Sequence, residues 1–215
     1  MFLDAHTHSL EGNGIYNVIV GKDTSVPFRA FSTGIHPWYV SDATFDEQLS
    51  TLRKYSENAL CVALGEAGLD KRCETPWELQ VKVFEAQIEL AEQQAKPLII
   101  HCVKAHQELL KFKKQDSIPW VLHGFNQKET VGRTLLEHDF YISFGKALLQ
   151  EESNASAFIR QVPYDRIFLE TDEAEFSIVE IYEAATKRLD LPLEKLESIL
   201  QANFDRVFKK LACKI

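Results

Sequence analysis

Short apolar segments alternate with helix-like stretches along most of the chain, and the clearest apolar segments end at a polar residue. Apolar runs of this length are typical of buried strands, whereas apolar residues at spacings of three and four are typical of a helix that buries one face. The pattern predicts strands most strongly over residues 2–8, 59–65, 97–101, 120–123, 140–144 and 166–170, and more weakly over 15–20 and 28–34.

The intervening stretches predict helices. The clearest covers 75–94, where Trp77, Val81, Phe84, Ile88 and Ala91 repeat at helical spacing. Other helices are predicted over 45–57, 104–114, 129–138, 151–161 and 176–189, with a closing pair from residue 192 to the C-terminus. Strands that alternate with helices form parallel sheets, and roughly eight such repeats predict an α/β fold, a single (β/α)8 TIM-type barrel over residues 1–215.

The chain is short for that fold, which usually takes about 250 residues. The missing length lies near the start, because no convincing helix is visible between His8 and Gly34. We therefore expect a distorted barrel whose first crossover helix has been trimmed, with the second strand a candidate for antiparallel pairing. An open α/β sheet is the alternative.

Composition is that of an ordinary globular protein, with 45% hydrophobic and 26% charged residues, and the longest apolar runs are too short to cross a membrane. The opening residues carry no basic segment of a secretory signal. The four cysteines, which are Cys61, Cys73, Cys102 and Cys213, show no C-x-x-C spacing. These features favour a cytoplasmic protein that does not bind membranes.

The net charge of −8 argues against tight non-specific binding to a polyanion, since that affinity comes from Lys and Arg. It does not exclude a phosphate-containing substrate, because divalent cations would reverse the potential within a pocket.

Six potential metal ligands lie at or just past the ends of predicted strands: His6, His8, Glu66, His101, His123 and Asp172. In a barrel the C-terminal ends of parallel strands converge on one spot, so residues far apart in sequence can surround the same ions. Imidazoles mixed with carboxylates are typical of catalytic sites for one or two divalent cations rather than of sealed structural zinc sites. The set predicts a metal-dependent hydrolase.

His6 and His8 are the sharpest local signal. Residues i and i+2 of a strand project to the same face, so both imidazoles can bind one ion. Asp4 lies on that face too and is a candidate to orient a ligand. The alternative is two polar residues on an exposed strand.

Glu66 follows a buried run, and a carboxylate there can bridge two cations. Acids after strands are also common helix caps, and Asp70 fits a supporting or capping role better. His101 and His123 each close an apolar run. Either alone would more often be a buried histidine of the core, but two in the same context favour a ligand role.

Glu170 and Asp172 share strand parity, so alternation does not settle which carboxylate binds metal. Asp172 is favoured because it lies nearer the loop, where it can also accept a proton from water. His36 follows another strand, where it either contacts substrate or is held in a proline-containing turn.

These segments together resemble the TatD family of metal-dependent deoxyribonucleases, within the amidohydrolase superfamily. The matching stretches, in order, are Asp4-Ala5-His6-Thr7-His8, Gly34-Ile35-His36-Pro37, Gly65-Glu66-Ala67-Gly68-Leu69-Asp70, Pro97-Leu98-Ile99-Ile100-His101-Cys102, Leu122-His123-Gly124-Phe125, Leu169-Glu170-Thr171-Asp172 and the segment from Asn203 to Phe208. They span nearly the whole chain.

The resemblance implies two divalent metal ions (Mg, Mn or Zn) in a distorted TIM barrel. His6, His8 and Asp172 would hold one ion, His101 and His123 the other, and Glu66 would bridge them. The implied reaction is hydrolysis of DNA phosphodiester bonds by a two-metal-activated hydroxide, with Glu66 and Asp172 as the catalytic carboxylates. The implied partner is DNA, as single strands or strand ends, or a small phosphodiester.

Three departures from the family bear on substrate binding. Lys71 and Arg72 stand near the place of the family's arginine, so the phosphate-binding cation is one of these two by inference. Lys104 replaces the arginine after the His-Cys pair, which gives up bidentate phosphate geometry. The family's long loop after the Thr-Asp pair is absent, and acidic Glu173 and Glu175 take its place. Two alternatives therefore stay open, a hydrolase of a small ester or amide and a non-catalytic metal-binding barrel. The oligomeric state is not indicated.

Overall fold

The computed structural model describes residues 2–115, 117–173 and 175–208. The strands are β1 (Asp4–Thr7), β2 (Gly14–Ile19), β3 (Phe31–Gly34), β4 (Cys61–Asp70), β5 (Leu98–Val103), β6 (Trp120–Leu122), β7 (Phe140–Phe144) and β8 (Ile167–Leu169). The α-helices are α1 (Phe45–Ser56), α2 (Trp77–Gln94), α3 (His106–Leu110), α4 (Glu129–Glu137), α5 (Asn154–Phe158), α6 (Ile178–Leu189) and α7 (Leu193–Val207). Short 3-10 turns are η1 (Pro37–Tyr39), η2 (Lys146–Leu149), η3 (Ile159–Gln161) and η4 (Tyr164–Arg166).

The strand order in the sheet follows the chain, from β1 to β8. Pairing is parallel between β2 and β3, β3 and β4, β4 and β5, and β7 and β8. The segment that follows β8 forms a parallel bridge with β1, between Asp172 and Thr7. Parallel strands in chain order, with the last beside the first, are the topology of the (β/α)8 barrel, and this confirms the predicted fold class.

The start of the chain differs from that topology as expected. Among the described residues no helix lies between β1 and β2 or between β2 and β3, which confirms the trimmed crossover. The expectation of an antiparallel second strand is wrong for its pairing with β3, which is parallel. The connection over residues 20–30 needs no helix, since an extended segment of that length exceeds the length of β2.

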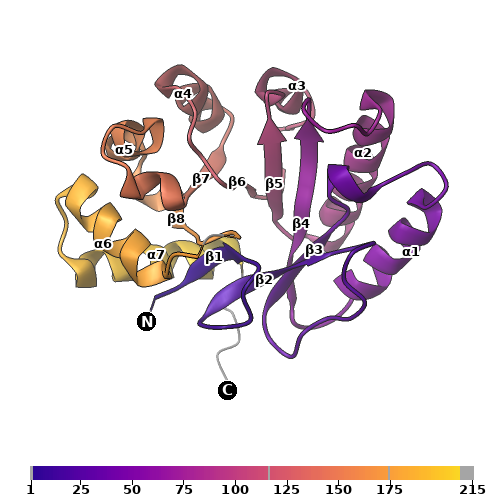
Figure 1. Ribbon diagram of the computed structural model, residues 1–215, viewed down its shortest axis with the longest axis horizontal. Coiled ribbons are helices and arrows are strands. Elements are labelled where there is room, and N and C mark those ends of the chain that lie inside the picture. Colours follow the sequence, from indigo (N-terminus) through magenta and orange to yellow (C-terminus); the bar gives the residue numbers. More distant parts are fainter. Residues whose placement is uncertain (1, 116, 174, 209–215) are drawn as a thin grey trace. The chain divides into compact units, whose positions relative to one another are not determined.

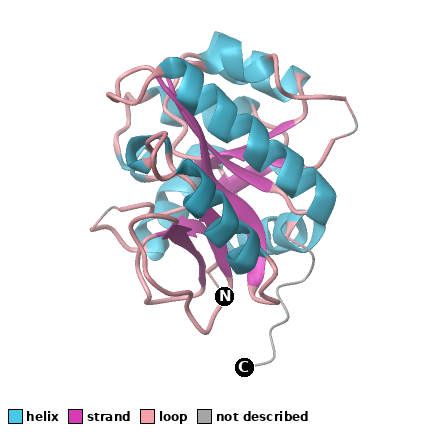
Figure 2. Ribbon diagram, turned by 90° about the vertical axis from the view of Figure 1, so that its right-hand side faces the viewer, coloured by secondary structure: helices cyan, strands magenta, loops and turns pink. Residues whose placement is uncertain are grey.

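The chain divides into two compact units, which are described separately. Unit 1 comprises Met1–Ile15 and Val121–Ile215, and unit 2 comprises Tyr16–Trp120. In unit 2, α1 and α2 pack beside β3, β4 and β5 (Figures 1 and 2). Helix α2 buries Phe84, Ile88 and Ala91 of the predicted stripe, whereas Trp77 and Val81 are only partly buried.

Two glycines bring β4 and β5 into close contact within unit 2. Gly65 has φ +131° and Gly68 has φ +156°. A Cβ at Gly65 would overlap the carbonyl oxygen of Ile99, and one at Gly68 would overlap that of His101. Only glycine tolerates both the conformation and this approach. The end of β5, where His101 lies, is therefore held against β4.

In unit 1, α6 and α7 lie near β8 and β1 (Figure 1). Helix α6 starts in a capping box formed by Ser177 and Glu180. The hydroxyl of Tyr182 donates to the carbonyl of Leu3 and accepts from its amide, each at 3.0 Å. Phe168 packs against Phe204 at the centre of this unit's aromatic core. The first residues of the chain are thus tied to a helix near its end.

Three predicted helices differ from the observed ones. Helix α3 has only five residues rather than covering 104–114, and beyond its end the Lys113 ammonium donates to the Ser117 hydroxyl. The prediction over 151–161 is met by α5 and η3. One helix, α7, covers residues 193–207 instead of a pair, and residues 209–215, including Cys213, lie outside the described part. In the described part of the chain, no helix is both long and apolar enough to cross a membrane.

Candidate metal centre

The main chain brings the end of β1 and the segment after β8 together in unit 1. The amide of Asp172 donates to the carbonyl of His6 at 2.9 Å, and the amide of His8 donates to the carbonyl of Asp172 at 3.1 Å. Asp172 adopts the left-handed conformation, with φ +58°, which aspartate tolerates better than most residues. One carboxylate is thereby placed beside two imidazoles.

The three side chains converge on a small volume. His6 Nε2 lies 3.5 Å and His8 Nε2 lies 3.8 Å from the same oxygen of Asp172, Oδ1. One possible ligand atom from each of the three residues lies within 4.8 Å of the others. Two imidazole nitrogens and a carboxylate oxygen are the donor set that zinc and other first-row divalent ions accept. The residues present fit a divalent cation.

Asp4 supports this arrangement through Thr171 and through the main chain of His6. It accepts hydrogen bonds from the Thr171 hydroxyl at 2.6 Å, the Thr171 amide at 3.1 Å and the His6 amide at 3.2 Å. The Thr171 hydroxyl is also hydrogen-bonded to the Thr7 hydroxyl at 2.9 Å. Burial raises the pKa of Asp4 to about 6, although these hydrogen bonds act to lower it.

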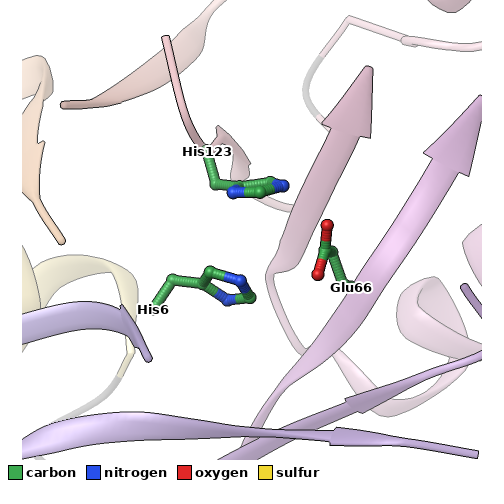
Figure 3. A group of neighbouring side chains, drawn as sticks. All are labelled: His6, Glu66 and His123. Atoms are coloured by element: carbon green, nitrogen blue, oxygen red, sulfur yellow. The ribbon is translucent and has the colours of Figure 1, made fainter. Parts of the chain in front are cut away.

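His123, which follows β6, also lies beside His6. Their ring centroids are 4.5 Å apart, with the planes inclined at 46° (Figure 3). His123 Nδ1 lies 3.5 Å from Glu170 Oε1, and that oxygen also accepts from the amide of Gly124. The two acids that strand alternation could not tell apart therefore have different neighbours. Asp172 lies beside His6 and His8, and the fully buried Glu170 lies beside His123.

Unit 2 carries its own cluster around Glu66, which projects from β4 (Figure 3). Asn17 of β2 holds this residue twice, because its Nδ2 donates to Glu66 Oε2 at 3.2 Å and its Oδ1 accepts from the Glu66 amide at 3.0 Å. Ser32 Oγ also donates to Asn17 Oδ1, at 3.1 Å. The asparagine fixes one carboxylate oxygen of Glu66 and leaves Oε1 to face the histidines of this unit.

His101 lies between two carboxylates. Its Nδ1 is 2.8 Å from Glu66 Oε1, and its Nε2 is 3.3 Å from Asp70 Oδ2. Asp70 also accepts from the Trp38 indole at 2.7 Å and from the Arg72 amide at 2.7 Å. Burial acts to raise the pKa of Asp70, but these hydrogen bonds outweigh it and lower the pKa. Both carboxylates can only accept, so the short contact with Glu66 places a proton on Nδ1 in the metal-free protein. With an ion at Nδ1, Asp70 would accept the proton of Nε2 and so leave the Nδ1 lone pair to that ion. Asp70 thus lies where a supporting residue was expected.

His36 also faces Glu66, with its Nε2 3.4 Å from Oε1. Its Nδ1 accepts a hydrogen bond from the Trp38 amide at 3.2 Å, so in the neutral ring the proton lies on Nε2. A metal-bound imidazole normally donates, rather than accepts, through its other nitrogen. His36 is therefore better suited to donate a hydrogen bond than to bind metal.

The predicted substrate-binding cations follow β4 and β5. Lys71 forms an ion pair with Glu108, and its ammonium lies 5.5 Å from the centroid of the Trp77 ring. Arg72 is exposed, and its guanidinium has no ion-pair partner among the described residues. Lys104 is exposed in the turn after β5, with φ +53°. Arg72 and Lys104 are both exposed to an anion from solution, and of the two only Arg72 offers a bidentate guanidinium.

One residue of these clusters was not foreseen as part of the site. Asn17 is a fully buried polar side chain on β2. Glu170, which strand alternation left open as an alternative to Asp172, is also fully buried and lies just after β8. A single polar residue inside an apolar run was the available signal for Asn17, since an unpaired amide would be costly there. That signal does not name the partner.

Comparisons of this chain with known proteins agree on one family. The model of the family described as TatD related DNase matches residues 22–209. An uncharacterized metal-dependent hydrolase, YabD of Bacillus subtilis, is 28% identical over 89% of this chain and 86% of its own length. The 3'-5' ssDNA/RNA exonuclease TatD of Erwinia amylovora is 32% identical over 66% of this chain, but the match spans only 56% of that protein.

Solved structures show the same fold. The TatD homologue YJJV from Escherichia coli K12 superposes with a TM-score of 0.81 at 20% identity, covering 96% of this chain and 97% of that one. A TatD-family hydrolase from Entamoeba histolytica superposes with a TM-score of 0.70 at 19% identity, covering 83% and 75%. The chain thus belongs to the TatD family of metal-dependent hydrolases.

Proposed function

We propose that this chain is a divalent-metal-dependent deoxyribonuclease that hydrolyses phosphodiester bonds of single-stranded DNA or of strand ends. The observation that carries the proposal is the convergence of His6, His8 and Asp172 on one volume in unit 1. Family membership supports hydrolysis, and the nuclease name of the Erwinia relative supports the substrate class.

The proposed centre takes two ions, of Mg, Mn or Zn. His6, His8 and Asp172 would hold one, His101 and His123 would hold the other, and Glu66 would bridge them. When bound, such ions stabilise negative charge on phosphate oxygens and lower the pKa of water. This assignment follows the family resemblance, and it treats residues 1–215 as one working domain.

The chain's own residues prepare that chemistry. Asp172 would accept the proton of the attacking water, with its left-handed main chain held by β1. Asn17 holds one oxygen of Glu66 and so presents the other. Asp70 orients His101 so that its Nδ1 is presented.

Three cationic side chains and one histidine would contact the substrate phosphates. The Nε2 proton of His36 would be donated to a phosphate oxygen, and the exposed Arg72 would pair with the phosphate as a bidentate donor. Lys71, already paired with Glu108, and the exposed Lys104 would add positive potential along the path of the strand.

A second candidate is hydrolysis of a small ester, amide or phosphodiester. Only a few residues separate Asp172 from Ser177, the N-cap of α6, and Glu173 and Glu175 there are exposed. A short acidic connection would repel a long polyanion but not a small substrate. The free cysteines among the described residues favour a cytoplasmic location for either activity.

The test begins with protein stripped of metal by a chelator and reloaded with Mg, Mn or Zn. Each form is incubated with end-labelled single-stranded DNA, a small phosphodiester reporter and a carboxylester reporter. Metal-dependent release of nucleotides supports the nuclease, and turnover of a small reporter without DNA cleavage selects the second candidate. If no substrate is turned over while metal still raises the melting temperature, the non-catalytic alternative holds.

A further inference from the structure

Trp38 is unusual because a large aromatic side chain is left in solvent although it lies beside His101, a proposed metal ligand. It lies on η1, directly after His36 and Pro37, and it is 55% exposed. Tryptophan is normally highly buried, since its ring offers a large apolar area. An exposed tryptophan next to hydrolytic chemistry therefore needs a reason.

The ring is held firmly although it is exposed. Its indole N–H donates to Asp70 Oδ2 at 2.7 Å, and Asp70 is in turn 3.3 Å from His101 Nε2. The ring lies edge to face with His36 at 5.1 Å and with His101 at 6.1 Å. These contacts fix its position relative to His101 and leave part of its surface uncovered. A ring with little freedom to lose is well suited to bind another flat group.

The surroundings of Trp38 combine aromatic and cationic side chains. Tyr39 follows it and is 38% exposed, with the Lys22 ammonium 5.5 Å from the centre of its ring. Arg72 is exposed and lies next to Asp70 through a main-chain hydrogen bond. Exposed rings interleaved with cations are typical of surfaces that bind single-stranded nucleic acid, where rings stack on bases and cations meet phosphates. A purely apolar partner would gain nothing from these charges.

We propose that the exposed face of Trp38 stacks on a nucleobase of single-stranded DNA and so positions the neighbouring phosphate for hydrolysis. This inference rests on the proposed nuclease function and names the substrate feature that the same site would recognise. Because every base has an aromatic face, the contact would favour unpaired strands without selecting a sequence.

The test compares three variants with the parent. Trp38→Leu removes the ring, and Trp38→Phe keeps an aromatic face but loses the hydrogen bond to Asp70. Phe28→Leu removes an exposed aromatic ring from the same unit and serves as the matched control. The substrates are a single-stranded oligonucleotide and the same oligonucleotide with abasic tetrahydrofuran residues near the cleaved end. Thermal melting verifies that each variant is folded.

Stacking predicts that Trp38→Leu raises KM for the base-bearing strand by about tenfold or more, with kcat little changed. The parent and Trp38→Leu should cleave the abasic strand with equal KM. On the base-bearing strand, the KM of Trp38→Phe should stay close to that of the parent, and Phe28→Leu should not differ from the parent. Equal loss of kcat on both strands in Trp38→Leu and Trp38→Phe would overturn the proposal, because Trp38 would then act only through Asp70 and His101.

The two proposals can fail separately. If the metal-loaded parent cleaves no DNA, the nuclease function fails, and stacking is then tested by binding of labelled oligonucleotide to the parent and to Trp38→Leu. An approximately tenfold weaker affinity that disappears with the abasic strand supports stacking. Unchanged affinity, or absence of binding by the parent, contradicts it and leaves the exposed ring to a protein contact.

Discussion

Asp172 stands opposite Thr7 in a parallel β-bridge, so the residue after the last strand is paired with the end of the first. The two hydrogen bonds of this bridge involve the residues on either side of Thr7, which are His6 and His8. The main chain therefore places the Asp172 carboxylate beside both imidazoles without the help of a bound ion. Formation of this site depends on closure of unit 1 between its two chain segments.

Thr171→Val should loosen that closure. The hydroxyl of Thr171 donates to Asp4 and is also hydrogen-bonded to the Thr7 hydroxyl, in a buried setting. Valine keeps the shape but leaves the buried Asp4 oxygen without its donor. We expect a loss of about 1–3 kcal/mol in the free energy of unfolding, measured by urea denaturation of metal-free protein. Thr186→Val, which removes an exposed hydroxyl on α6, should change stability by less than about 0.5 kcal/mol. Equal effects of the two changes would contradict this role for Asp4 and Thr171.

Asp70→Asn should weaken metal binding without removing a proposed ligand. An amide oxygen accepts the His101 Nε2 proton more weakly than an ionised carboxylate does, so Nδ1 is oriented toward an ion less firmly. Loss of such an orienting partner typically costs about ten- to a hundredfold in metal affinity. Competition with a chromophoric chelator measures this change. Glu108→Gln, which breaks the ion pair with Lys71, is the control and should leave metal affinity as in the parent.

Asn17→Leu should affect both stability and the carboxylate of Glu66. The substitution removes an acceptor from the buried Glu66 amide and a donor from its carboxylate. We expect destabilisation of about 1–3 kcal/mol, together with weaker metal binding. Asn154→Leu changes an exposed asparagine on α5, and it should alter neither the stability nor the metal affinity. A variant at position 17 as stable as the parent would show that these hydrogen bonds contribute little.

The residues at strand ends could be predicted because two simple rules act together. Buried strands reveal themselves as apolar runs, and the parallel alternation of strands and helices places their ends at one edge. His6, His8 and Asp172 follow from those rules, and the structure brings them together. The role of Asn17 does not follow from them. Asn17 acts by holding Glu66, which is 49 positions away in the sequence and lies beside it only when β2 and β4 are folded.

Helix lengths were harder to predict for a related reason. The stretch 104–114 contains helix-forming residues, yet α3 ends at Leu110. Beyond it, Lys113 donates to Ser117 and lies 5.7 Å from the centre of the Trp120 ring. The Lys113 side chain thus packs toward the start of β6, in a stretch that is not helical. Tertiary contacts of this kind outweigh local propensity and are invisible in the periodicity.

Thiol reactivity should separate the cysteines of unit 2. Burial raises the pKa of Cys61, so its thiol is protonated over a wider range of pH, and the thiolate is the reactive form. Alkylation of Cys61 in the native protein should stay slow at pH 8 and rise only as pH passes its ordinary value of about 9. The partly exposed Cys73 should react first. Peptide mapping by mass spectrometry distinguishes them, and rapid labelling of Cys61 at pH 8 would show that unit 2 opens readily.

The central claim is that His6, His8, Asp172, Glu66, His101 and His123 serve one pair of cations. Anomalous diffraction from crystals grown with manganese measures this directly. We expect two manganese peaks about 3.5–4 Å apart, one beside His6, His8 and Asp172 and the other beside His101 and His123, with Glu66 within coordination distance of both. Peaks that leave His101 and His123 outside coordination distance, or no ordered ion at His6 and His8, would contradict it.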